Sequence, residues 1–366
     1  MKHYKFILSG GGTGGHIYPA LAIGEKILER FPGSDLLFVG AIGRMEMKKI
    51  PDEGYKIKGI WISGFYRDNF TKNMLLPLKL LVSFIQSFII NLIYRPSAVI
   101  GTGGYVSGPM LFCASIMNIP TIIQEQNSFA GITNKLLSKR VNLISVAYDK
   151  MEKFFPKQKI RLTGNPIRKS IIDSIQDKKI VFDFFSLDSN KKTIAILGGS
   201  LGAEKINELI TSIIPFIESN EIQIIWQCGE IYYERYNYLK NRSFIRLYPF
   251  IQNMNFLYKA ADLIISRAGA GTISELAIVG KPCILIPSPN VADNHQFYNA
   301  NYLKEIGAAE VFNEGDPFSE IELIIKNILE SKQKQFNMHR ALLKMAKPKA
   351  TDIIVDEIYK LIRLHD

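Results

Sequence analysis

The sequence is poor in the residues that build disulfides and metal sites. Its 366 residues include three cysteines and five histidines. Cys113, Cys228 and Cys283 stand singly within apolar runs, and no pair has the C-x-x-C spacing of a redox or zinc site. Because unpaired cysteines of this kind are typical of reducing compartments, we expect a cytoplasmic protein without disulfides.

The sequence also lacks a targeting segment and a nucleic-acid motif. The apolar run before the first glycines, Phe6 to Leu8, is too short for a signal peptide. Lysine and arginine exceed aspartate and glutamate by 11, an excess that suits a nucleotide, a nucleic acid or an acidic lipid surface. No basic block, RNP-like aromatic motif or zinc spacing is present, so the sequence does not favour nucleic acid as a partner.

A glycine-rich stretch follows that first apolar run. Residues 9–16, Ser-Gly-Gly-Gly-Thr-Gly-Gly-His, join it to a helix-compatible segment at 17–30. Glycines allow positive φ and leave N–H groups bare, and the following helix N-terminus favours an anion. The spacing G-x-G-x-x-G is present, but the strand expected at 36–39 ends in Gly40 rather than in the acid that a dinucleotide ribose requires. The stretch predicts phosphate or sugar binding, with a plain tight turn as the alternative.

Short apolar segments alternate with helical segments along most of the chain. We expect strands at 36–39, 57–60, 98–101, 121–124, 160–163, 193–197, 222–228, 245–247, 263–266 and 283–286. Such alternation predicts parallel sheets covered by helices on both faces. Residues 173–192 are charged and irregular, and the plan then repeats. The sequence therefore predicts an α/β protein of two Rossmann-like domains, at 1–168 and 169–350, followed by a final helix within 351–366.

The segment Met74 to Tyr94 is the most apolar part of the chain. Its 21 residues are long enough to span a bilayer. Its polar members, however, recur at helical spacing and form one stripe: Lys79, Ser83, Gln86, Ser87 and Asn91. The pattern predicts an amphipathic helix. Two outcomes stay open for its apolar face, which either packs on the sheet or dips into a membrane surface.

The second half carries another glycine turn and a late polar cluster. Gly198-Gly199-Ser200-Leu201-Gly202 stands between the strand expected at 193–197 and a single helix expected from Ala203 to Phe216. This turn predicts a second phosphate site. Further on, Gly271 opens a helix with Glu275 in its first turn, where a carboxylate either accepts two bonds from vicinal hydroxyls or merely complements the helix dipole. Gln296 and Asn299 share a helix face, which either binds sugar hydroxyls or is solvated.

Six motifs in order resemble those of the MurG family of glycosyltransferases, over nearly the whole chain. They are Gly-Gly-Thr-Gly-Gly-His, Gly-Gly-Tyr-Val-Ser-Gly-Pro, Glu-Gln-Asn, Gly-Asn-Pro-Ile-Arg, Gly-Gly-Ser and the stretch Gly269 to Glu275. The resemblance implies a GT-B fold, with two Rossmann-like domains facing each other across a cleft and the C-terminal helix packed on the first. It implies that residues 1–168 bind acceptor and membrane and that residues 169–350 bind the UDP-sugar.

The same resemblance implies the reaction. An inverting enzyme would move N-acetylglucosamine from UDP-N-acetylglucosamine to undecaprenyl-diphosphate-linked muramoyl pentapeptide, at the cytoplasmic side of the inner membrane. The segment Met74 to Tyr94 would meet that membrane. The alternatives are a UDP-N-acetylglucosamine epimerase of the same architecture, a nicotinamide-dependent oxidoreductase, and a membrane-docked scaffold without activity.

The resemblance also implies site residues, position by position. Glu275 would hold the ribose, Ile251 would meet uracil through its backbone, and Asn127 and Gln296 would contact the sugar, with Asn299 nearby. The implied substrate contacts are Thr13, Gly14, Gly15, Asn127, Arg168, Ser200, Ile251, Ala270, Gly271, Thr272, Ile273, Ser274, Glu275, Gln296 and Asn299. Gln124 departs from the family, since many relatives carry histidine there.

Inversion requires one general base and no covalent intermediate. His16 is the first candidate, since imidazole titrates near neutral pH and the glycine loop would aim it at substrate, and Glu125 is the second. N–H groups after Ser200, together with Arg168, would stabilise the leaving diphosphate, so we expect neither a metal nor a cofactor.

Overall fold

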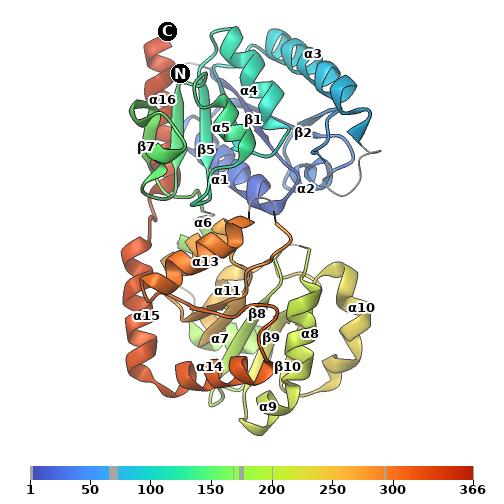
Figure 1. The fold of residues 1–366 in the computed structure, drawn as a ribbon, viewed down its shortest axis with the longest axis vertical. Helices are drawn as coiled ribbons and strands as arrows, with labels where there is room; N and C mark the ends of the chain where they lie inside the picture. The colour runs from blue at the N-terminus through green and yellow to red at the C-terminus, as the bar shows by residue number, and fades with distance from the viewer. Residues whose placement is uncertain are drawn as a thin grey trace. The chain divides into compact units, whose positions relative to one another are not determined.

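The computed structural model describes residues 3–65, 73–167, 169–172, 177–199, 201–291 and 294–365 (Figure 1). The chain divides into two compact units. The first comprises Met1–Arg168 together with Lys347–Asp366, and the second comprises Lys169–Ala346. Each unit is built around its own parallel sheet, so the predicted fold class, α/β with two Rossmann-like domains, is confirmed.

The sheet of the first unit has seven parallel strands in the order β3-β2-β1-β4-β5-β6-β7. They are β1 (Lys5–Gly10), β2 (Asp35–Ala41), β3 (Ile57–Ile60), β4 (Ala98–Gly103), β5 (Thr121–Glu125), β6 (Leu143–Val146) and β7 (Ile160–Leu162). The strand order reverses between β1 and β4, which pair directly. In open sheets of this kind, ligands bind beyond the carboxyl ends of the strands at such a reversal.

Helices cover both faces of this sheet. The helices are α1 (Gly14–Arg30), α2 (Glu46–Asp52), α3 (Leu76–Tyr94), α4 (Ser107–Ile116), α5 (Ile132–Leu137) and α16 (Ala350–His365). One core cluster joins the sheet to α3, α4 and α5. A second cluster joins it to α1, α2 and α16. The alternation of apolar segments in the sequence thus produces two separate cores, one on each face.

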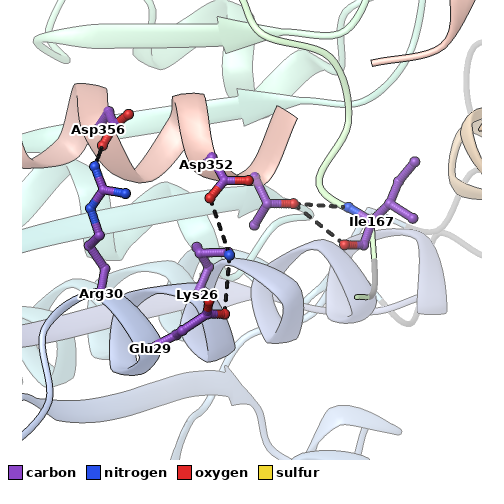
Figure 2. A network of polar contacts seen from close by, with 7 residues as sticks. Lys26, Glu29, Arg30, Ile167, Asp352 and Asp356 are labelled. Carbon is purple, nitrogen blue, oxygen red and sulfur yellow. Dashed lines mark hydrogen bonds and ion pairs between the residues drawn. The ribbon is translucent and has the colours of Figure 1, made fainter. Parts of the chain in front are cut away.

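The last helix, α16, shares the second core cluster with α1. Ion pairs also join the two helices (Figure 2). Lys26 of α1 lies 3.2 Å from Asp352 and 3.1 Å from Glu29, and Arg30 pairs with Asp356. Burial lowers the pKa of Lys26, but the bonds to both carboxylates outweigh it and the pKa is raised. Thr351 Oγ1 also accepts from the N–H of Ile167 (3.2 Å). Residues far apart in sequence therefore form one compact unit.

The second unit repeats the plan with six parallel strands in the order β10-β9-β8-β11-β12-β13. They are β8 (Thr193–Leu197), β9 (Gln223–Gln227), β10 (Ile245–Tyr248), β11 (Leu263–Ser266), β12 (Cys283–Leu285) and β13 (Glu310–Val311). The helices are α6 (Lys169–Ile172), α7 (Lys178–Phe185), α8 (Glu204–Ser212), α9 (Ile214–Ser219), α10 (Tyr233–Tyr236), α11 (Met254–Ala260), α12 (Ala270–Val279), α13 (His295–Glu305), α14 (Phe318–Glu330) and α15 (Lys332–Met345). Here the strand order reverses between β8 and β11.

The structure differs from the sequence expectations at a few elements. Two strands, β6 and β13, were not expected. The single helix expected from Ala203 to Phe216 is broken into α8 and α9, because Pro215 at the start of α9 has no N–H to continue the first helix.

Helix α3 turns its polar stripe toward the protein. Ser83, Ser87 and Asn91 are fully buried, and Asn91 Nδ2 donates to the carbonyl of Met110 in α4 (3.4 Å). The large apolar side chains that are exposed along the helix include Leu78, Leu81, Ile85, Phe88, Ile89, Leu92 and Ile93. Of the two outcomes left open for the apolar face, packing on the sheet is therefore the wrong one. Small polar side chains allow α3 to approach α4 closely, and Asn91 finds a hydrogen-bond partner there.

By length and composition, α3 is the one helix among the described residues that could cross a membrane. Its most apolar stretch of 18 residues has a mean hydropathy of 1.8, and 22% of that stretch is buried inside the protein. A core helix of this composition would be mostly buried, so α3 is a surface helix with an apolar outer face.

Candidate active site

The first glycine turn lies where the strand order of the first unit reverses. A Cβ on Gly10 would stand 2.0 Å from Thr102 Oγ1 of β4, so the two strand ends approach too closely for any side chain. Gly104, with φ of +79°, lies against the carbonyl of Gly11 in the same way. Only glycine fits both positions, so the loops after β1 and β4 form one glycine-lined surface.

Thr13, Gly14 and Gly15 form the start of α1 at this turn. Thr13 is the N-cap residue, it is exposed, and its side chain makes no capping hydrogen bond. The first N–H groups of a 17-residue helix have no partner within the helix and carry a partial positive charge. This end of α1 is therefore suited to an anionic group.

His16, on the first turn of α1, is half-buried and held through one ring nitrogen. Its Nδ1 lies 2.9 Å from the carbonyl of Thr102 and 3.2 Å from Gln126 Oε1. The hydroxyl of Thr102 in turn donates to the carbonyl of His16 (2.7 Å). A carbonyl oxygen accepts hydrogen bonds and never donates them. In the neutral ring, Nδ1 therefore carries the hydrogen and Nε2 carries the lone pair.

Glu125, at the end of β5, is buried and fully engaged in holding its own loop. Oε1 accepts from the backbone N–H of Asn127 (3.0 Å) and from its Nδ2 (3.3 Å). Oε2 accepts from the N–H of Gly131 (3.0 Å) and from Asn134 Nδ2 (2.8 Å). These four bonds fix the loop that carries Asn127.

Glu46 supports the glycine turn and was not expected from the sequence. It is completely buried on α2, where Oε2 accepts from the N–H of Gly12 (3.0 Å) and Oε1 accepts from the N–H of Ala41 (2.9 Å). No spacing or motif in the sequence marks this acid, because its partners are backbone groups of two other segments.

The glycine turn of the second unit is tied to Ile251 by one buried amide. Gln227 Nε2 donates to the carbonyl of Gly199 (3.0 Å), and Gln227 Oε1 accepts from the N–H of Ile251 (2.9 Å). Any backbone contact of Ile251 with a base edge therefore falls to its carbonyl. Two predicted contacts, Ser200 and Arg168, lie outside the described residues.

Helix α12 begins one residue earlier than expected. Gly269 is its N-cap residue, so Ala270, Gly271 and Thr272 form the first turn. A Cβ on Gly271 would meet no described atom within 4 Å, so the space beside this turn is open. Ile273 is buried and donates its N–H to Gly269. The Ser274 hydroxyl donates to the carbonyl of Ala270 (2.9 Å), so both residues fix the helix start.

Glu275 lies in the second turn of α12, so its expected place in the first turn is wrong. The earlier helix start moves it along the axis, and its role at the helix dipole is correspondingly weaker. The hydroxyl of Tyr258, a buried residue of α11, donates to Glu275 Oε2 (2.6 Å). This bond orients a half-buried carboxylate, a group whose oxygens can each accept more than one hydrogen bond.

Gln296 and Asn299 of α13 differ in exposure and in partner. Gln296 is half-buried, and its Oε1 accepts from the N–H of Ser288 beyond β12 (2.9 Å). Asn299 is completely buried, and its Nδ2 donates to the carbonyl of Ala268 (3.3 Å). The structure thus makes Asn299 a support of the loop before α12, whereas Gln296 lies at the surface.

Cysteine chemistry and metal clusters are not evident in the described part of the chain. Burial raises the pKa of Cys113 and Cys228 to about 11 and that of Cys283 to about 12, so these thiols stay protonated. Among the residues with described positions, no three His, Cys, Asp or Glu side chains come together as metal ligands.

Within each unit, the predicted residues gather at the carboxyl ends of the strands. In the first unit these are Thr13, Gly14, Gly15, His16, Glu125 and Asn127. In the second unit these are Ile251, the run Ala270 to Glu275, and Gln296 and Asn299. The sequence did not point to Gln126, Gln227 and Tyr258, each of which holds a predicted residue in place, or to Glu46, which holds Gly12 of the glycine turn. All four act through contacts between distant segments.

Comparisons with known proteins agree with this architecture. Residues 6–146 match the glycosyltransferase family 28 N-terminal domain, and residues 193–354 match the family 28 C-terminal domain. A relative from Flavobacterium psychrophilum is 51% identical over 99% of both chains. It is named UDP-N-acetylglucosamine–N-acetylmuramyl-(pentapeptide) pyrophosphoryl-undecaprenol N-acetylglucosamine transferase.

Solved structures of lower sequence identity share this architecture. The crystal structure of MurG from Acinetobacter baumannii has a TM-score of 0.76 at 29% identity, covering 98% of this chain and 100% of that one. A UDP-N-acetylglucosamine 2-epimerase from Neisseria meningitidis, with a TM-score of 0.68 at 14% identity over 97% and 100%, shares the fold alone. With matching domains in both units and such identity along the full length, the chain belongs to the MurG family within glycosyltransferase family 28.

Proposed function

We propose that the chain transfers N-acetylglucosamine from UDP-N-acetylglucosamine to N-acetylmuramyl-(pentapeptide) pyrophosphoryl-undecaprenol, with inversion at the transferred sugar. The observation that carries this proposal is the 51% identity, over 99% of both chains, to a relative named for that reaction. Residues 1–168 with the helix 351–366 would bind the acceptor, and residues 169–350 would bind the donor.

The donor half of the proposal uses groups at the carboxyl ends of β8, β11 and β12. The Glu275 carboxylate, oriented by Tyr258, is suited to the two ribose hydroxyls, because a carboxylate oxygen accepts more than one bond. The first-turn N–H groups of α12 beside the open space at Gly271 suit the diphosphate, and Gln296 would contact the sugar. Ser200 and Arg168 would complete the diphosphate contacts.

His16 is the base that we propose for the acceptor hydroxyl. With Nδ1 bonded to a carbonyl, the neutral ring presents the Nε2 lone pair, which would take the proton as the hydroxyl attacks. Glu125 is the weaker candidate, since both of its oxygens already hold the Asn127 loop. We therefore assign Glu125 a positioning role. Thr13, Gly14 and Gly15, at the N-terminus of α1, would contact the donor, as the resemblance implies.

We further propose that the protein is a peripheral enzyme of the cytoplasmic side of the inner membrane and that α3 is its lipid contact. The exposed apolar face of α3 supports this proposal, since it would lie at the boundary between headgroups and acyl chains. Lys79 would not meet headgroups, because its ammonium lies 3.2 Å from Ser63 Oγ and over the Trp61 ring. Arg95, exposed just beyond the helix, is the better placed cation.

The test is a transfer assay with labelled UDP-N-acetylglucosamine, run with and without a short-chain analogue of the lipid acceptor. Labelled disaccharide lipid formed only with both substrates is the expected result. Conversion of the donor alone would indicate an epimerase instead. Donor binding without any turnover under either condition would indicate a binding scaffold and would contradict the proposal.

A further inference from the structure

We propose that Gln126 is the positioning residue for His16, fixing both the tautomer of the ring and the strength of Nε2 as a base. Gln126 is 2% exposed, and its Oε1 lies 3.2 Å from His16 Nδ1. The carbonyl of Thr102 contacts the same nitrogen at 2.9 Å. This inference rests on the proposed role of His16. No role was expected for Gln126 from the sequence, although it lies between Glu125 and Asn127.

The orientation of the Gln126 amide is set by what surrounds its other end. Nε2 lies 2.7 Å from the carbonyl of Thr102 and 3.0 Å from the carbonyl of Gln124, and it also contacts Gln124 Oε1. Three acceptors around one terminal atom require that atom to be the NH2 group. The atom beside His16 must then be the carbonyl oxygen.

A second amide locks this arrangement from behind. Gln124 Nε2 donates to Asn165 Oδ1 (3.0 Å), and Asn165 Nδ2 donates to the carbonyl of Gln126 (3.1 Å). All three side chains are buried. Rotation of the Gln126 amide would place two carbonyl oxygens against each other in a dry environment, which is costly.

Two oxygen acceptors therefore face His16 Nδ1. In the neutral ring they hold the hydrogen on Nδ1 and leave the lone pair on Nε2. When Nε2 takes a proton, both acceptors contact a charged N–H, and such bonds favour the charged form. In Ser-His-Asp sites, a buried carboxylate accepts the hydrogen bond from Nδ1 of the histidine. Here the neutral oxygens of Thr102 and Gln126 accept it instead.

The two acids that neighbouring elements bring to this end of the sheet have other partners. Glu46 of α2 accepts from Gly12 and Ala41, and Glu125 of β5 accepts from its own loop. Tyr105, in the loop after β4, lies beside Gly12. The acids of α16 pair instead with Lys26 and Arg30 further along α1. Among the described contacts, those to Nδ1 come from two neutral oxygens.

The deciding variant is Gln126→Met, which keeps the length of the side chain and removes the acceptor. Loss of one acceptor disfavours the imidazolium, so the acid limb of the pH profile of kcat/KM should move down by about one unit. A weaker base should also lower kcat by about tenfold, with KM for UDP-N-acetylglucosamine unchanged. A purely structural role would lower activity without moving the limb.

A second readout needs no substrate. Side-chain 15N NMR titration follows each of the five histidines, and His16→Asn identifies the His16 signals by their loss. We expect the Nδ1–H tautomer in the wild type and a lower pKa of His16 in Gln126→Met, by about the same unit as the limb. If this variant fails to fold, Gln126→Asn, whose shorter amide cannot reach the ring, undergoes both measurements.

Gln223→Met is the matched control, because it removes an equally buried amide whose partners are Asp188 and Thr193 of the second unit. Its acid limb and its His16 titration should match the wild type. Unchanged values in the folded Gln126 variant, or equal shifts in the Gln223 control, would overturn the assignment. A different pair of results is a lowered pKa of His16 in Gln126→Met together with full turnover by His16→Ala. That pair would support Gln126 as the positioning residue of His16 but would remove His16 as the base.

Discussion

Replacing Leu81 and Ile85 of α3 with serine should weaken binding to acidic vesicles by roughly 30-fold. The two side chains are 59% and 52% exposed, so a membrane would bury about half of each. Full burial of Leu or Ile contributes about 1.5–3 kcal/mol, so half burial contributes about 1 kcal/mol for each residue. The sum of about 2 kcal/mol corresponds to that loss, at about 1.4 kcal/mol for each tenfold change.

The assay is flotation with liposomes that contain acidic phospholipid, across a range of lipid concentrations. The chain offers a matched control in its second unit, where Leu323 and Ile180 are 59% and 53% exposed. The double variant Leu323→Ser with Ile180→Ser makes the same chemical change at the same exposure on a different surface. Both pairs should leave stability within about 0.5 kcal/mol of the wild type, since surface changes rarely do more. Retained binding in the α3 variant, or equal losses in both, would refute α3 as the lipid contact.

Three further outcomes are expected. His16→Ala should lower kcat by about 10²- to 10⁴-fold with little change in the KM for UDP-N-acetylglucosamine, and steady-state kinetics that show unchanged kcat would remove it from the mechanism. Tyr258→Phe should raise that KM by about fivefold at constant kcat, because the Glu275 carboxylate loses its orienting bond; a fall in kcat alone would contradict the ribose role. Ile358→Ala, in the core that joins α16 to the sheet, should cost about 2–5 kcal/mol in urea unfolding, whereas Asp352→Asn, in a partly exposed ion pair, should cost less than about 1 kcal/mol. Equal costs for these two variants would show that the ion pairs rather than the core hold α16.

The glycine turns show how far local sequence can specify a site. Gly10 follows a short apolar run and precedes a helical segment, and the structure places it at the reversal between β1 and β4. Strand, turn and helix are each local choices, so a few adjacent residues suffice to predict them. The predicted place of Glu275 in the first turn of α12 was wrong, because the helix begins at the position that Gly269 caps, one residue earlier than expected.

Helix α3 shows where such reasoning fails. Its periodicity predicts two faces correctly, but periodicity does not say which face turns inward. The buried side is polar here because Asn91 finds the Met110 carbonyl on α4, and Gln86 Oε1 accepts from the N–H of Trp61 (2.8 Å). Those partners belong to other segments and exist only once the chain has folded.

Local sequence predicts the alternation of strands and helices, the two glycine turns and the residues that stand beside them, since these follow from neighbours along the chain. The groups that support them could be identified only in the folded structure. Glu46 reaches Gly12, Gln126 reaches His16, Gln227 reaches Ile251 and Tyr258 reaches Glu275 across separations of 17 to 110 residues. Such contacts arise because a doubly wound sheet brings distant strand ends to one edge, where a buried polar group must find its partner in another segment.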